Sequence, residues 1–178
     1  NQNFLNKGLA YSLEARANTQ ELGLTKNPIK VAAWAKQKDA NFSSSHATSS
    51  GKEQADMGVE VLGQLSQDWQ VLGSAKRVKA TQKLSNISDK VETLDKHSVS
   101  AIWNYDANSS IVTELEHVGL NTQTTATASS EKSEAGLVGV RVNRKVNSEL
   151  DVFGSVQTSF AEKNYASNDA FTVGAKYS

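Results

Sequence analysis

The residue types that most often perform chemistry are few in this sequence and widely spaced. Its three histidines, His46, His97 and His117, stand far apart along the chain and match no metal-ligand spacing. His117 with nearby serines, or His97 with Asp95, could imitate a hydrolytic pair, but spacing alone places no nucleophile, base and orienting group together. The chain has no cysteine and no nucleophile-elbow, zinc-protease, phosphate-loop or dinucleotide motif. We therefore predict no catalytic residues, no metal site, no cofactor and no enzymatic activity.

Charged side chains recur at alternate positions within segments of about ten residues. In residues 136–145, "GLVGVRVNRK", the valines alternate with Arg141, Asn143 and Lys145. Successive side chains of a strand point to opposite faces, so each such segment has an apolar face and a charged face. The charged faces are predicted to carry Glu14, Arg16, Lys30, Lys36, Lys38, Glu60, Glu114, Glu116, Arg141 and Lys176.

Nine segments of this kind are predicted to be strands. They cover residues 8–25, 28–39, 57–67, 69–81, 97–106, 110–120, 136–145, 149–161 and 170–178. The connections alternate between tight turns and long polar stretches such as residues 83–96 and 121–134. This pattern predicts one domain, residues 1–178, built as an antiparallel β-meander with tight turns at one end and long loops at the other.

Helices are the competing prediction for three stretches. Residues 27–40, 53–67 and 75–96 all contain good helix formers, and Asn27 with Pro28 could start a helix. The alternation of the apolar residues in 29–35 and the glycines Gly58 and Gly63 favour strands instead. We predict an all-β chain.

Aromatic residues gather near the ends of the predicted strands. Such a distribution is typical of the aromatic girdles of membrane barrels, and it predicts lipid-facing positions for Tyr11, Trp69, Trp103, Tyr105, Phe160, Phe171 and Tyr177. No segment reaches the roughly 20 apolar residues that a membrane helix needs. The mean hydropathy of −0.48 does not oppose a membrane barrel, because only every second residue of each strand faces lipid.

The ending "FTVGAKYS" resembles the C-terminal strand of Gram-negative outer-membrane β-barrels, which carry apolar residues at alternate positions and finish on an aromatic residue. Phe171, Val173, Ala175 and Tyr177 fit that signature if one aromatic residue follows Ser178. The turn regions "NRKVNSELDVFGS" and "LSQDWQVLGS" also resemble the short periplasmic turns of this superfamily. The resemblance implies a transmembrane barrel in the bacterial outer membrane. That barrel has about 8–10 strands, or this chain is the C-terminal part of a larger barrel.

Three functions remain open at this point. The first is a porin-like passive channel for small polar solutes or ions, whose lumen is lined by the charged residues; Lys30, Lys36 and Lys38 would mildly favour anions. The second is a small non-conducting barrel with a structural, adhesion or partner-binding role, its charges paired in a plugged lumen. The third is a soluble β-barrel ligand carrier. Expected partners are outer-membrane lipid and lipopolysaccharide, with a further copy or an envelope protein possible. Nucleic acid is not expected, because 19 basic residues balance 19 acidic ones.

Overall fold

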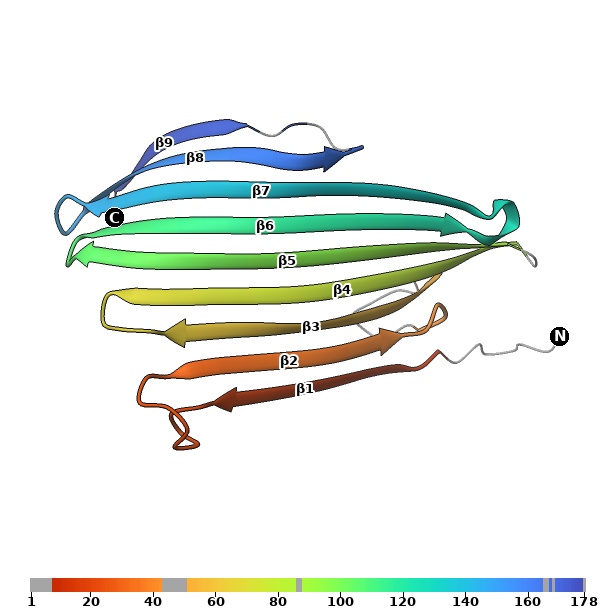
Figure 1. The fold of residues 1–178 in the computed structure, drawn as a ribbon. Helices are drawn as coiled ribbons and strands as arrows, with labels where there is room; N and C mark the ends of the chain where they lie inside the picture. Colours follow the sequence, from red (N-terminus) through yellow and green to blue (C-terminus); the bar gives the residue numbers. More distant parts are fainter. Residues whose placement is uncertain (1–7, 43–50, 86–87, 165–166, 168, 178) are drawn as a thin grey trace.

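The computed structural model describes residues 8–42, 51–85, 88–164, 167 and 169–177. Nine strands follow one another in a single sheet, and each pairs antiparallel with the next in the chain (Figure 1). The strands are β1 (Ala10–Asn18), β2 (Ile29–Lys38), β3 (Lys52–Gln64), β4 (Trp69–Ser85), β5 (Ser88–Asp106), β6 (Ser109–Thr124), β7 (Ser129–Lys145), β8 (Leu150–Lys163) and β9 (Ala170–Tyr177). A short 3-10 turn, η1 (Thr125–Thr127), joins β6 to β7. The all-β antiparallel meander predicted from the sequence is confirmed.

Turn chemistry fixes the hairpins at the end where the sequence predicts tight turns. Between β7 and β8, the side-chain Oδ1 of Asn147 accepts hydrogen bonds from the backbone N–H groups of Glu149 and Leu150, both at 2.9 Å. Between β5 and β6 only Ala107 and Asn108 separate the two strands. The stretches with competing helix propensity are strands, since each completes a ladder with its neighbours on both sides.

Two stretches that we predicted as long loops are strands instead. β4 continues to Ser85 and β5 starts at Ser88, while β6 reaches Thr124 and β7 starts at Ser129. The segments 83–96 and 121–134 are mostly polar, and apolar residues such as Val91 and Leu94 lie on opposite faces, so both segments lack the apolar alternation that marks a strand in the sequence. The predicted loop at residues 41–54 is also shorter than expected, since β3 begins at Lys52. Its residues 43–50 lie outside the described residues.

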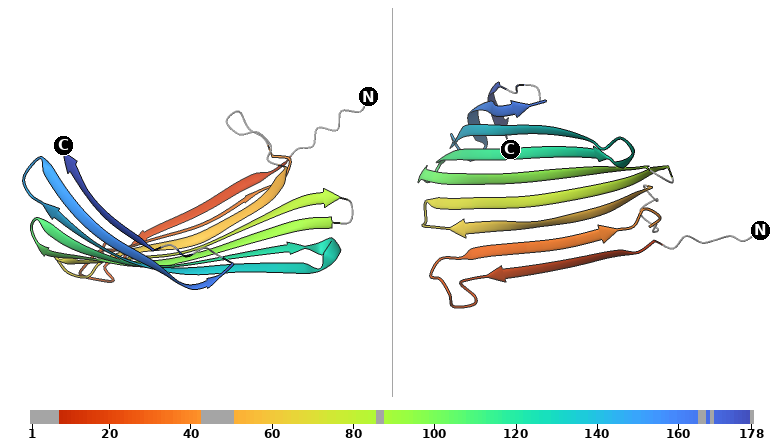
Figure 2. Two further views of the ribbon diagram at one scale, coloured as in Figure 1. Left: turned by 90° about the horizontal axis from the view of Figure 1, so that it is seen from above. Right: turned by 45° about the vertical axis from the view of Figure 1, so that its right-hand side comes forward.

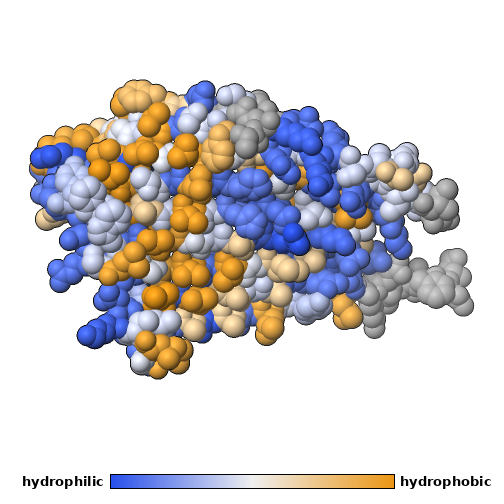
Figure 3. Space-filling model, viewed as in Figure 1, coloured by the Kyte–Doolittle hydropathy of each residue, from blue (hydrophilic) through white to orange (hydrophobic). Residues whose placement is uncertain are grey.

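The sheet is curved, and its two faces differ in polarity. Figure 2 shows the curvature, and on the convex side, which faces the viewer in Figure 3, apolar side chains gather over the strand ends near the tight turns. Val99 on this face is 54% exposed and Leu115 is 50% exposed. On the opposite face the carboxylate side chains of Asp56 and Glu116 are only 20% and 18% exposed. This polarity is the reverse of that of a water-soluble sheet, whose shielded face is apolar.

No hydrophobic side chain of the described residues is buried. Among the described residues there is also no helix with the length and apolar character needed to cross a membrane. Most of the exposed large apolar side chains lie on the convex face of strands from β1 to β9, although Leu62 and Leu72 lie on the concave face. Many exposed apolar side chains on one face of a folded protein mark contact with an apolar medium or a partner.

Candidate functional site

The strand register places all ten predicted charged positions on the concave face. Each row of directly paired residues crosses several strands, and one row runs from Arg16 through Glu60 to Glu116. A second row joins Lys30 on β2 to Glu114 on β6. Lys36, Lys38, Glu14, Arg141 and Lys176 share the same face. The register thus confirms that these residues lie on one face, and that they line a lumen stays a prediction.

Ion pairs hold part of this face together. The Lys76 ammonium lies 3.2 Å from Asp56, and the Lys96 ammonium lies 2.7 Å from Glu116. Lys76 and Lys96 are direct cross-strand partners, so the two carboxylates offset a repulsion between like charges. Both carboxylates are more shielded from solvent than Val99 of the convex face, which strengthens these attractions relative to surface pairs.

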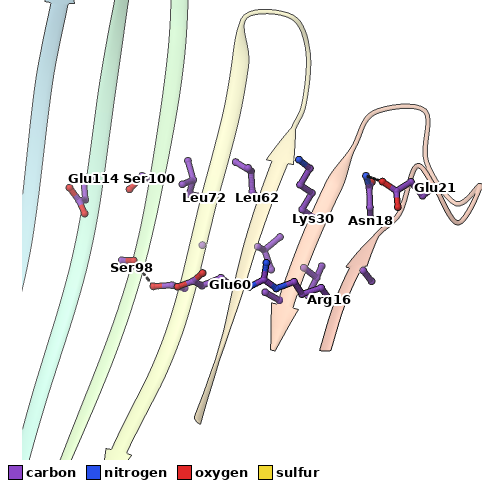
Figure 4. Close-up of a pocket in the computed structure, with 16 residues that line it drawn as sticks. Arg16, Asn18, Glu21, Lys30, Glu60, Leu62, Leu72, Ser98, Ser100 and Glu114 are labelled. Atoms are coloured by element: carbon purple, nitrogen blue, oxygen red, sulfur yellow. Dashed lines mark hydrogen bonds between the residues drawn. The ribbon is translucent and has the colours of Figure 1, made fainter. Parts of the chain in front are cut away.

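A hollow lies on the concave face toward the tight-turn end (Figure 4). Charged side chains from four strands line it, namely Arg16, Lys30, Glu60 and Glu114. The strands between the two glutamates, β4 and β5, carry Ser74 and Ser98, whose hydroxyl groups share a 2.8 Å hydrogen bond in which either can be the donor. A wall of this kind offers charges of both signs and hydroxyl groups to hydrated solutes.

Trp34 is a wall residue that the sequence analysis missed. Its indole Nε1–H donates a 2.8 Å hydrogen bond to Asp56, and its ring covers Gly58 on the next strand. A glycine is required there, because an added Cβ would also come within 2.8 Å of the Ala75 carbonyl oxygen. The sequence contained the information needed to find it. Trp34 is four positions after Lys30 on the same strand, so its side chain points to the polar face on which we placed Lys30.

The predicted girdle residues all lie on the convex face. At the tight-turn end, the rings of Trp69 and Trp103 stack with centroids 5.5 Å apart, and Tyr105 lies 5.8 Å from Trp103. Tyr177 also lies at this end, where its hydroxyl donates a hydrogen bond to Glu149. Tyr11, Phe160 and Phe171 lie on the same face and are exposed. Their contact with lipid stays a prediction.

Two histidines come together, contrary to our expectation that all three are far apart. His97 and His117 are direct partners on β5 and β6, with ring centroids 6.3 Å apart. Beside them, the Arg77 guanidinium donates two hydrogen bonds to the Asp95 carboxylate, of 2.6 and 3.1 Å. Asp95 is therefore engaged by Arg77 rather than placed as a partner of His97. No cluster of three or more His, Cys, Asp or Glu side chains suited to a metal occurs among the described residues. His46 lies outside them.

Comparison with solved structures shows which known fold the chain has. No protein-family model matches the chain, and no curated protein matches it. Among solved structures, it is similar to a loop-deletion mutant of OmpT, an outer membrane protein of Vibrio cholerae. The TM-score is 0.62 at 15% identity, over 98% of this chain and 55% of the OmpT chain. The siderophore receptor PirA of Pseudomonas aeruginosa also matches, with a TM-score of 0.40 at 11% identity over 99% of this chain and 40% of that one.

The chain spans about half of the OmpT chain that it matches. This match overturns our prediction that the protein is not an enzyme. We based that prediction on the absence of known catalytic motifs. The match, at 15% identity, establishes the fold alone, and proteins of one fold have unrelated activities, so the absence of motifs does not exclude catalysis.

The polarity of the two faces, the aromatic rows and the match to OmpT agree with the family resemblance of the C-terminal strand. The chain has the fold of the bacterial outer-membrane β-barrels.

Proposed function

We propose that this sheet forms part of the wall of a passive channel for small polar solutes or ions. The observation that carries the proposal is the reversed polarity of the sheet, with charged side chains on the shielded concave face and exposed valines and leucines on the convex face. In a barrel the concave face becomes the lumen. A lumen lined by charges and hydroxyls favours water and hydrated ions over lipid.

Charge balance along the concave face supports a preference for anions. The basic side chains of this face are Arg16, Lys30, Lys36, Lys38, Lys52, Lys76, Lys90, Lys96, Arg141, Lys145 and Lys176. The acidic ones are Glu14, Asp56, Glu60, Glu92, Glu114, Glu116, Glu131 and Asp151. Basic groups outnumber acidic groups, so the wall has a positive local potential.

The two alternatives fit the geometry less well. A soluble carrier binds its ligand on an apolar concave face, whereas here that face is charged and the convex face is apolar. A plugged, non-conducting barrel pairs its lumen charges, and pairs such as Lys96–Glu116 follow that pattern. Glu60 and Glu114, however, lie in the hollow among serine hydroxyls rather than directly opposite a cationic residue.

Conductance in planar lipid bilayers tests the proposal. We expect discrete current steps from protein folded in detergent, and a reversal potential that indicates an excess of anion permeability. Glu60→Gln should raise the anion preference, and Lys30→Gln should lower it, because the two residues line the same hollow with opposite charges. The control is Glu134→Gln on the convex face, which should leave selectivity unchanged. Folded protein without current steps, or an equal shift from the control, would contradict the channel.

A further inference from the structure

The directions of the two edge strands restrict how the barrel can close. β1 and β9 are the edges of the sheet, and eight antiparallel pairings separate them in chain order. The two edge strands therefore run in the same direction, as Figure 1 shows. Direct pairing of β9 with β1 would create a parallel pair, whereas closed outer-membrane barrels are antiparallel with an even number of strands.

Neither edge strand, β1 (AYSLEARAN) nor β9 (AFTVGAKY), contains a proline or a bulge, two devices that natural proteins use to keep a sheet edge unpaired. Their charged residues, Glu14, Arg16 and Lys176, all point to the concave face, as in the interior strands. The two edge strands thus have the side-chain pattern of strands with neighbours on both sides.

Edge side chains are also the most exposed of the apolar face. Phe171 and Val173 of β9 are 76% and 68% exposed, and Leu13 of β1 is 70% exposed, against 54% for Val99 inside the sheet. An open edge also leaves every second N–H and C=O group without a partner. In the hydrocarbon layer each such group costs several kcal/mol, so a membrane-embedded sheet requires both edges to be paired.

A second copy of the sheet does not meet this requirement. Two copies related by an axis along the membrane normal bring β9 of one copy against β1 of the other, and these strands are again parallel. Turning one copy end for end makes the pair antiparallel, but it places the tight turns of the two copies on opposite sides of the membrane. Only an odd number of additional strands lets β9 and β1 both pair antiparallel.

The match to OmpT indicates how many additional strands are needed. Nine strands that cover 55% of a barrel correspond to about 16 strands in total, since 9/0.55 ≈ 16, and this number is even as closure requires. We propose that seven further membrane-spanning strands of the same polypeptide lie between β9 and β1 and close the barrel. A barrel of this size has a water-filled lumen, whereas about eight strands leave a lumen filled by side chains.

The expected separation of β1 and β9 follows from barrel geometry. With neighbouring strands about 4.8 Å apart and tilted by about 40°, 16 strands give a circumference of about 100 Å and a diameter of about 32 Å. Eight strand intervals then place β1 and β9 on opposite walls, about 30 Å apart. A single closing strand would place them about 12 Å apart, and direct pairing about 6 Å apart.

Spin labels on the protein in native outer membranes measure this distance. The 178 residues contain no cysteine. With any cysteine of the further strands replaced by serine, Ala17→Cys and Ala175→Cys give one label on β1 and one on β9, both on the convex face. We expect a separation of about 30 Å. The matched control pairs Ala17→Cys with Val31→Cys, which are direct partners on β1 and β2 and should lie within about 10 Å.

The source of the strands is read from the same sample by denaturing electrophoresis. The labelled chain should run well above 19.2 kDa, at about 35 kDa by the same length ratio. Separations near about 12 or 6 Å, with a correct control pair, would overturn the seven additional strands. A long separation with a labelled chain of 19.2 kDa would overturn their origin in the same polypeptide. Neither readout depends on conductance, so the channel and the strand number fail separately.

Discussion

Replacing Val99 or its neighbour Ser100 by arginine asks which side of the sheet meets lipid. The two residues are adjacent on β5, so their side chains point to opposite faces. Val99 lies on the convex face between Gly73 and Leu115. Ser100 lies on the concave face between Leu72 and Glu114. The same charge is therefore delivered to two sites that differ in the medium beyond them.

The expected cost follows from the depth of Val99 in the apolar band. Val99 lies four positions from Trp103 of the aromatic row, which is about 13 Å along the strand and about 10 Å in depth after tilt. That depth is close to the middle of a hydrocarbon layer about 25 Å thick, where an outward arginine costs about 2–4 kcal/mol. We expect Val99→Arg to lower the free energy of unfolding by this amount. Ser100→Arg should cost less than about 1 kcal/mol, since it reaches water and Glu114.

Reversible unfolding from lipid vesicles by a denaturant measures both values, with tryptophan fluorescence as the signal. On a soluble protein Val99 is an exposed surface residue, and its replacement changes stability by no more than about 0.5 kcal/mol. A loss that small for Val99→Arg, or a larger loss for Ser100→Arg, would refute the assignment of the convex face to lipid.

Two other predictions concern the concave face. Gly58→Ala should lower the free energy of unfolding by about 1–3 kcal/mol, because the added methyl group meets the Trp34 ring and a carbonyl oxygen. Gly73→Ala, where an added Cβ meets nothing within 4 Å, should leave stability nearly unchanged in the same denaturant titration; equal losses would contradict the packing of Trp34. Glu116→Gln should shift the reversal potential further toward anions by freeing the charge of Lys96, with a stability change below about 1 kcal/mol. Adding Lys96→Gln should restore the original potential, and a shift that persists in the double variant would contradict their pairing.

The sequence was most informative where one face of a strand is apolar. In β7 the valines alternate with Arg141 and Asn143, so period-two patterning identifies both the strand and its polar face. The tight-turn ends of β4 to β8 were placed within one residue for the same reason, aided by Trp69 and Trp103. The predicted strand 8–25 was too long, because β1 ends at Asn18 and the following polar residues form the turn to β2. Beyond this apolar band β4 to β7 continue as strands with polar residues on both faces. A pattern that depends on contact with an apolar medium disappears there, although the backbone ladder continues.

The pairing of His97 with His117 could not be read from the sequence. The β5–β6 hairpin contains a bulge between Asn104 and Asp106, next to its two-residue turn. Without this bulge the register moves by one residue, and His97 faces Val118 instead. A one-residue shift changes which residues are partners along the whole hairpin, and nothing in the local composition announces the bulge.

A spin-label scan along β5 tests the central claim most directly, namely that the convex face meets lipid and the concave face meets water. Single cysteines at residues 97–103 would carry the label in lipid vesicles, and collisions with oxygen and with a water-soluble nickel complex would be measured at each. We predict an alternation of period two, with Val99 and Ala101 accessible to oxygen from the lipid and Ser98, Ser100 and Ile102 accessible to nickel from water. Alternation with the opposite phase, or nickel access at every position, would contradict the membrane barrel.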